Sequence, residues 1–314
     1  MIQDITGSPT MFMVGLDHRI NFCRELVGSA DEATATDRHQ AARLKTVVFN
    51  ALKRAVENGL SKSQAAIWSE SDLGEAVLLR ARGMSLVTAV SADRRGEDGG
   101  AELTPTRGWD VTTRLDADFA AVRVNYNPDS PRHVREQMQD TLFRLSRKCH
   151  AGNRGLMVEL TASPTRRQIE RTGGFEEART MVLLESMRQL QDAGVEPTAW
   201  VFESPADKRS AALLAAQAHI DERYGISVLF VVGSEPDPSD ESDYPTRAEE
   251  EMTVLAARTL GATGILIGPA AYFAHLARLQ RGLISEEEAI ERIARRITSL
   301  QRVFSDARAT AEVM

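Results

Sequence analysis

The stretch that decides the fold is Val195-Glu196-Pro197-Thr198-Ala199-Trp200-Val201-Phe202-Glu203-Ser204-Pro205. It predicts a short buried strand that ends in a carboxylate and then breaks at a proline. Similar units recur along the chain: an apolar run, a polar or charged residue at its end, and then a helical segment. This repetition predicts an α/β barrel whose active site is built from the ends of its strands.

Seven further apolar runs complete the pattern. They are Met11–Leu16, Gln64–Trp68, Leu86–Val90, Phe119–Val124, Gly155–Leu160, Ile226–Val232 and Gly264–Ile267. Segments with helical periodicity alternate with them, such as residues 40–58. Eight short strands alternating with helices predict a single (β/α)8 TIM barrel over residues 1–314. The alternative is a doubly wound open sheet, but the first strand is followed by Asp17-His18-Arg19 and not by the glycine-rich phosphate loop typical of that fold.

Three segments between the elements are predicted to be long loops. Residues 94–110 are rich in glycine, residues 163–175 are polar and rich in arginine, and residues 235–247 are acidic and rich in proline. We expect the last of these to be mobile. Loops of this length are commonly lids or disordered segments. Residues 20–27, in contrast, show a helical pattern.

The composition limits the classes of function. With 314 residues, 42% hydrophobic and 26% charged, the chain resembles an ordinary soluble globular protein. A formal net charge of -7 argues against a nucleic-acid-binding surface, which is normally basic. No apolar run approaches the roughly 20 residues that span a bilayer, and the N-terminus lacks a signal-peptide pattern. We therefore expect a cytoplasmic protein with a small-molecule substrate and no membrane partner, and the sequence leaves a homo-oligomer open.

The carboxyl ends of barrel strands meet on one face. They would bring together Asp17, His18, Arg19, Glu70, Asp93, Arg123, Tyr126, Glu159 and Glu203. Carboxylates and arginines are costly to gather unless they are paired or used. We expect the catalytic groups to be Glu203, Glu159, Asp17 and His18, and the groups that bind a polar, anionic substrate to be Arg19, Glu70, Arg123 and Tyr126. The alternative is a set of salt bridges that only ties the strand ends together.

A metal site is the less supported option. Glu70, Glu159 and Glu203 could supply oxygen ligands to a divalent cation. No HxH or HExxH spacing accompanies them, and the two cysteines, Cys23 and Cys149, have no zinc-site spacing. We expect neither a metal nor another cofactor.

Several motifs together resemble one family of barrels. In chain order they are Leu16-Asp17-His18-Arg19 with Phe22, Glu70 with Asp72-Leu73-Gly74, Tyr126-Asn127-Pro128-Asp129, Glu159, Trp200-Val201-Phe202-Glu203-Ser204-Pro205, and Gly264 to Gly268. The set resembles the class I aldolase-like barrels of the tagatose-bisphosphate aldolase type. It is most similar to the deoxy-keto-gluconate phosphate aldolase-like domain of myo-inositol catabolism. The resemblance implies a carbon–carbon lyase that acts on a phosphorylated keto sugar through a lysine imine.

The sequence departs from that family at the reactive positions. Val201 occupies the position of the imine-forming lysine, Ala121 that of a second lysine, and Gly268-Pro269 that of a phosphate-binding Gly-Arg pair. Valine cannot form an imine, and Lys208 lies seven residues downstream in a predicted loop. We therefore expect an aldolase-like lyase or isomerase without imine chemistry. The alternative is a non-catalytic barrel that binds a metabolite or a partner protein.

Overall fold

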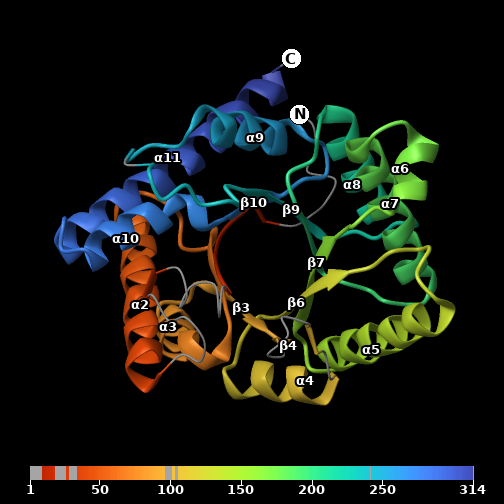
Figure 1. The fold of residues 1–314 in the computed structure, drawn as a ribbon, viewed down its shortest axis with the longest axis horizontal. Coiled ribbons are helices and arrows are strands. Elements are labelled where there is room, and N and C mark those ends of the chain that lie inside the picture. The colour runs from red at the N-terminus through yellow and green to blue at the C-terminus, as the bar shows by residue number, and fades with distance from the viewer. Residues whose placement is uncertain are drawn as a thin grey trace.

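Eight parallel strands close into a barrel, which confirms the predicted fold (Figure 1). The computed structural model describes residues 9–17, 26–27, 34–95, 101–102, 105–240 and 242–313. The barrel strands are β1 (Met11–Leu16), β2 (Ala65–Ser69), β3 (Val87–Ser91), β6 (Phe119–Asn125), β7 (Gly155–Thr161), β8 (Ala199–Phe202), β9 (Ser227–Val232) and β10 (Gly264–Ile267). Around the barrel they follow the order β1-β10-β9-β8-β7-β6-β3-β2.

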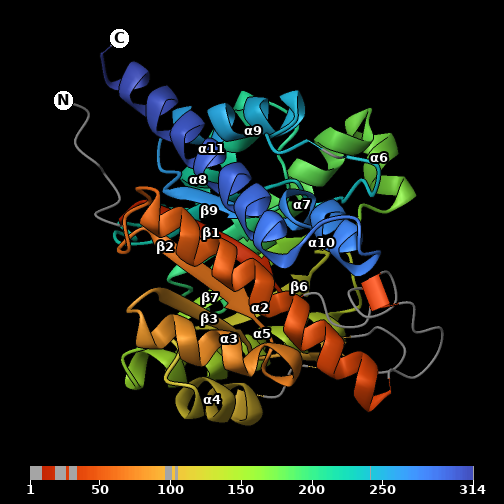
Figure 2. The same cartoon turned by 90° about the vertical axis from the view of Figure 1, so that its left-hand side faces the viewer.

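Helices surround the barrel on all sides (Figure 1). They are α2 (Ala35–Glu57), α3 (Ser71–Gly83), α4 (Pro105–Arg114), α5 (Arg132–Ala151), α6 (Arg166–Thr172), α7 (Phe175–Asp192), α8 (Lys208–Ala218), α9 (Arg247–Arg258), α10 (Phe273–Gln280) and α11 (Glu286–Val313), with the short 3-10 helix η2 (Pro269–Ala271). Figure 2 shows α11 and α2 side by side near β1. In the described part of the chain, no helix is both long and apolar enough to cross a bilayer.

The barrel closes between the first and last strands. Met11 to Val14 of β1 pair in parallel register with Gly264 to Ile267 of β10. The two backbones approach closely at Gly264, where an added Cβ would lie only 1.9 Å from the carbonyl oxygen of Met11. A side chain at position 264 would therefore push the closing strands apart.

Alternating side chains divide the apolar core into two parts. On β8, Ala199 and Val201 belong to the cluster inside the barrel, whereas Trp200 and Phe202 pack in the layer between strands and helices. Because successive side chains of a strand point to opposite faces, the next residue, Glu203, returns toward the barrel axis. The same alternation directs Arg123 on β6 and Glu159 on β7 inward at the carboxyl end of the barrel.

Two of the predicted loops contain helices. Within residues 94–110, α4 starts at Pro105, and Arg94–Arg95 pair with Ala101–Glu102 as a short antiparallel hairpin, β4 and β5. Within residues 163–175, α6 starts directly after its N-cap Thr165, which forms a capping box with Gln168 in the first turn, and Gly173, whose φ is 87°, caps its end. The loop prediction was therefore wrong for these parts.

The remaining boundaries agree more closely with the prediction. Residues 235–246 contain no helix or strand where the structure describes them. Helix α2 starts at Ala35, five residues before the predicted segment, because Thr34 and Asp37 form a capping box. The helix predicted over residues 20–27 lies almost entirely outside the described residues.

Candidate active site

Arg123 joins three strand ends at the carboxyl face of the barrel. Its Nε donates to Glu159 Oε2 at 2.7 Å, and its Nη2 lies 3.4 Å from Asp17 Oδ2. The guanidinium carbon also lies 5.6 Å from the ring centroid of Trp68, a buried side chain inside the barrel. The ends of β1, β6 and β7 thus place one cation between two carboxylates and over an aromatic ring. The strand-end pattern predicted that Asp17, Arg123 and Glu159 would lie together, but not the aromatic ring.

The electrostatic interactions in this cluster keep Arg123 positively charged and bring the pKa of Glu159 close to neutrality. Burial opposes the charge of Arg123, but Asp17, Glu159 and Asp93 hold its pKa above the ordinary value. Burial raises the pKa of Glu159 from 4.5 to about 7; Arg123 opposes this rise, and the negative charges of Asp17 and Glu203 reinforce it. A carboxyl group with a pKa near neutrality can both donate and accept a proton at physiological pH.

Glu203 is held at the end of β8 by an arginine that the sequence analysis did not identify. Arg179 of α7 lies 3.5 Å from Glu203 Oε2 and donates to the carbonyl oxygen of Ser204 at 2.6 Å. The Arg179 side chain is 15% exposed, whereas that of Glu203 is 44% exposed. Glu203 therefore faces solvent at the rim of the barrel, and the more buried Arg179 contacts its carboxylate.

Glu70 lies in a separate, buried ion pair. Both of its carboxylate oxygens accept from Lys45 Nζ at 2.7 Å, and the same amine contacts the carbonyl oxygen of Leu16. Both side chains are at most 1% exposed. The pair ties α2 to the ends of β1 and β2, next to Asp17. Glu70 is thus buried and paired with Lys45, and its carboxylate is not exposed to a substrate.

Tyr126 points away from the cluster. It is 3% exposed and packs in the layer between strands and helices. Its hydroxyl donates to Gln189 Oε1 of α7 at 2.9 Å and accepts from Gln139 Nε2 of α5 at 2.8 Å. The structure therefore does not bring Tyr126 together with Arg123. His18 and Arg19 lie outside the described residues.

The positions of the family's lysines are apolar and buried. Val201 and Ala121 are 0% exposed and pack inside the barrel, and Val201 pairs with Glu159 across neighbouring strands. All five lysines of the chain lie in the described residues. Lys45 is fully engaged by Glu70, and Lys208 is exposed on the first turn of α8. No lysine amine is therefore presented at the end of β6 or β8.

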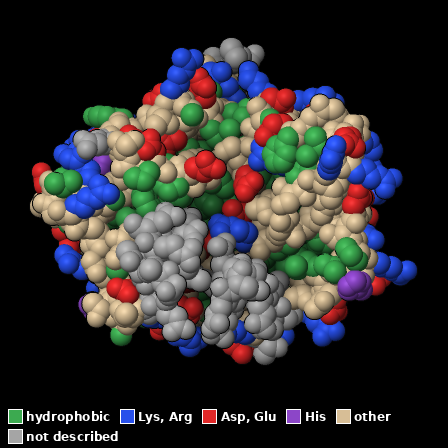
Figure 3. Space-filling view, in the orientation of Figure 1, with side chains coloured by type: hydrophobic (Ala, Val, Ile, Leu, Met, Phe, Trp, Pro, Cys, Tyr) green, Lys and Arg blue, Asp and Glu red, His purple; other side chains and the backbone are tan. Residues whose placement is uncertain are grey.

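The face at the carboxyl ends of the strands is mixed in charge. Figure 3 looks onto this face and shows acidic and basic side chains meeting around its centre. Among the described residues, no three His, Cys, Asp or Glu side chains are placed to share a metal ion. The arrangement is a paired cluster of carboxylates and guanidinium groups, with Arg123 between Asp17 and Glu159 and with Arg179 beside Glu203.

Comparison with known families gives a match over nearly the whole chain. The model of a family described as "Uncharacterized protein conserved in bacteria (DUF2090)" matches residues 4–308. None of the curated proteins compared with the chain matches it.

Solved structures share the fold at low sequence identity. An archaeal fructose-1,6-bisphosphate aldolase, with its catalytic lysine bound to the carbinolamine intermediate, is 13% identical, with a TM-score of 0.53 over 91% of this chain and 96% of that one. The YdjI aldolase of Escherichia coli K12 is 10% identical, with a TM-score of 0.52 over 94% and 91%. The protein Cgl0159 of Corynebacterium glutamicum is 16% identical, with a TM-score of 0.52 over 91% and 84%. At this identity the likeness establishes the (β/α)8 barrel fold alone.

Proposed function

The chain belongs to the DUF2090 family, and we propose that it is an aldolase-like barrel enzyme, a lyase or isomerase, that acts on a sugar-like or keto-acid substrate without forming a lysine imine. The observation that carries the proposal is Glu159. This buried carboxyl group ends a barrel strand, accepts a hydrogen bond from Arg123, and has a pKa of about 7. Perturbed pKa values of this kind cluster at functional sites.

The residues support a mechanism based on proton transfer. Glu159 removes or returns a proton at a carbon beside a carbonyl or hydroxyl group of the substrate. Because Val201 offers no amine, the negative charge that develops on the carbonyl oxygen requires another stabilising group. Arg123 supplies a fixed positive charge beside Glu159, and Asp17 keeps that guanidinium in place. Glu203, more exposed on the neighbouring strand, serves as the second acid or base.

Arg123 also provides the charge for an anionic group at the reacting end of the substrate. A carboxylate beside the carbonyl, as in a 2-keto acid, would lie against the guanidinium edge that Glu159 and Asp17 leave open. Because Asp17 and Glu159 contact this arginine and Asp93 adds a third negative charge near it, a single negative charge on the substrate suits the site better than a doubly charged group.

Proton exchange in deuterated water tests the proposal. The chain is incubated with a panel of keto sugars, 2-keto acids and their phosphate esters, and loss of the proton beside the carbonyl is followed by NMR. We expect exchange or bond cleavage with at least one compound, and a loss of about 10²- to 10⁴-fold in Glu159→Gln, the usual contribution of a general acid or base. Glu177→Gln, an exposed carboxylate on α7, should react like the native chain.

The second candidate function is a non-catalytic barrel that binds a metabolite or partner protein. The buried Val201 at the imine position favours it, because the reaction implied by the family resemblance is lost there. Binding of a panel compound with no exchange between pH 5 and 9 would support this alternative. Treatment with borohydride separates both candidates from an imine enzyme, since we expect no trapped adduct with any compound.

A further inference from the structure

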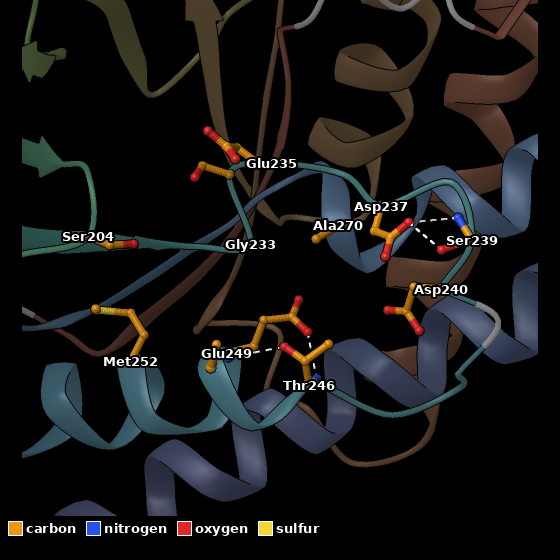
Figure 4. Close-up of a pocket in the computed structure, with 12 residues that line it drawn as sticks. Ser204, Gly233, Glu235, Asp237, Ser239, Asp240, Thr246, Glu249, Met252 and Ala270 are labelled. Carbon is orange, nitrogen blue, oxygen red and sulfur yellow. Dashed lines mark hydrogen bonds between the residues drawn. The ribbon is translucent and has the colours of Figure 1, made fainter.

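A polar cavity lies next to the candidate active site. Its volume is about 530 Å³, and it lies between the loop that follows β9 and the first turns of α9 (Figure 4). Ser204, the residue after Glu203, lines its inner end. A substrate that reacts at Glu159 and Glu203 could therefore extend its other end into this cavity, which we call the acidic pocket.

The acidic pocket has many acceptors and, among the residues that the structure describes, no basic side chain in its lining. Its lining residues include Glu235, Asp237, Asp240, Glu249, Ser234 and Ser239, and none of its lining residues is Lys, Arg or His. Asp240 and Glu249 share the charge of Arg296, which approaches from α11. The remaining charge is negative, so the pocket repels an anion.

Some of the backbone donors with which barrels often bind phosphate are engaged in other hydrogen bonds here. TIM-barrel enzymes frequently bind phosphate at the loops after the last two strands and at a short helix N-terminus. Here the short helix η2 begins with Pro269, which has no N–H, and Ala270 N donates to Gly233 O at 3.0 Å. At the start of α9, Thr246 and Glu249 cap each other in a capping box. The backbone amides of Ala270 and Glu249 are therefore already engaged and do not offer donors to a phosphate.

A buried carboxylate oxygen in the pocket requires a donor. Glu249 is 5% exposed, and its Oε2 accepts from Thr246 N at 2.7 Å and from Arg296 Nη2 at 2.6 Å. Its Oε1 has no hydrogen-bond partner in the part of the chain that the structure describes. Figure 4 shows this carboxylate pointing up between Gly233 and Asp240. An unpaired buried oxygen costs roughly 1–3 kcal/mol, so a ligand that donates to it would be favoured.

Gly233 makes room for this oxygen. Its φ is 71°, and an added Cβ would lie 2.7 Å from Glu249 Oε1. Glycine is the residue that adopts this conformation at little cost. At the floor of the pocket, Glu249 Oε1 thus lies directly against the backbone of Gly233, with no side chain between them.

We propose that the acidic pocket binds the uncharged, polyhydroxylated end of the substrate and excludes a terminal phosphate. Hydroxyl groups would donate to Glu249, Glu235 and Asp237, and Met252 and Ala270 would pack against the carbon chain. This inference rests on the proposed function for the location of the reacting end. It narrows the substrate to a 2-keto acid or keto sugar whose distal end is not phosphorylated.

Binding of a matched pair of compounds to the full chain tests the inference. Calorimetry or ligand-observed NMR compares 2-keto-D-gluconate with its 6-phosphate. We expect the unphosphorylated compound to bind at least tenfold more tightly. Glu235→Lys, an exposed residue of the lining, should reduce that ratio to about one or reverse it. Glu251→Lys, an exposed residue of α9 outside the pocket with the same change in charge, should leave the ratio unchanged.

Three results would overturn the inference. They are equal or tighter binding of the phosphate by the native chain, the same ratio in Glu235→Lys and Glu251→Lys, and no binding of either compound at 10 mM. The readout is binding and not turnover. A chain that binds selectively but exchanges no proton would therefore refute the proposed function and leave the acidic pocket supported.

Discussion

At the scale of single residues, the raised pKa of Glu159 suits it to proton transfer but also makes the folded chain less stable when the carboxyl group ionises. Burial raises its pKa from 4.5 in an ordinary environment to about 7 in the folded chain. The folded state therefore holds this proton more tightly than the unfolded state. The resulting stabilisation is complete below pH 4.5 and is lost as the pH rises through 7. At about 1.4 kcal/mol per pKa unit, the loss is roughly 3 kcal/mol.

Replacing Glu159 with glutamine should remove this pH dependence. We expect the native chain to lose roughly 3 kcal/mol of unfolding free energy relative to Glu159→Gln between pH 4.5 and pH 8. Urea denaturation of both proteins at several pH values measures the difference. Glu177→Gln, at an exposed position, should follow the native curve. Parallel curves for the native chain and Glu159→Gln would show that the carboxyl group ionises normally.

Part of the site could be predicted residue by residue, and part could not. Asp17, Arg123 and Glu159 meet as expected, because strand ends converge whatever their sequence. Alternation along β6 also explains Tyr126: it lies three residues after the inward-facing Arg123, and an odd separation directs it outward. Lys45 and Arg179 lie on helices, so neither strand-end position nor strand alternation could predict that they reach the site. Helical periodicity shows which face of a helix is buried, but not which strand end a long side chain will reach.

At the scale of elements, the loop between β9 and α9 is tied to the C-terminal helix. Arg292 and Arg295 of α11 contact Asp243 at 3.0 and 2.6 Å, and Arg296 contacts both Asp240 and Glu249 at 2.6 Å. The acidic sequence of residues 235–247 suggested a mobile loop. The arginines that neutralise it lie about 50 positions later in the chain, and no local pattern connects the two.

Among the arginines of α11 that contact this loop, the buried Arg296 should contribute most to the free energy of unfolding. The Arg296 side chain is 1% exposed, whereas that of Arg295 is 45% exposed. Arg296→Met leaves two carboxylates without their cation, and breaking a buried pair in this way costs about 3–5 kcal/mol. Arg295→Met breaks a partly exposed pair and should cost less than about 1 kcal/mol. Urea denaturation measures both; similar losses would mean that Asp240 and Glu249 find other partners.

Helices α4 and α6, which lie in segments predicted to be loops, are marked in the sequence by residues typical of helix starts and not by hydrophobic periodicity. α6 contains one apolar residue, Ile169, so it shows no hydrophobic period, but Thr165 and Gln168 form the capping box that marks its start. α4 begins at Pro105, and a proline fits the first turn of a helix as well as it fits a loop. End signals thus identify short polar helices that periodicity cannot detect.

At the scale of the whole molecule, the two ends of the chain complete one core. β1 pairs with β10 to close the barrel, and α11 packs along α2 and α9. Phe304 of α11 meets Phe12 of β1 edge to face, with ring centroids 5.3 Å apart. The rows of strand ends that form the site are held in a ring by this closure, because an open edge between β1 and β10 would let Asp17 move away from Arg123.

Removing the aromatic contact between the chain ends should therefore weaken the entire barrel. Phe304 is 1% exposed, and Phe304→Ala should lower the unfolding free energy by about 3–5 kcal/mol, as expected for a buried phenylalanine. Phe175→Ala truncates a side chain that is 51% exposed at the start of α7 and should cost less than about 1 kcal/mol. Denaturation followed by circular dichroism gives both values. If Phe304→Ala instead left the main transition in place and produced only a small early one, α11 would unfold separately, and the ring of strands would hold its shape without the C-terminal helix.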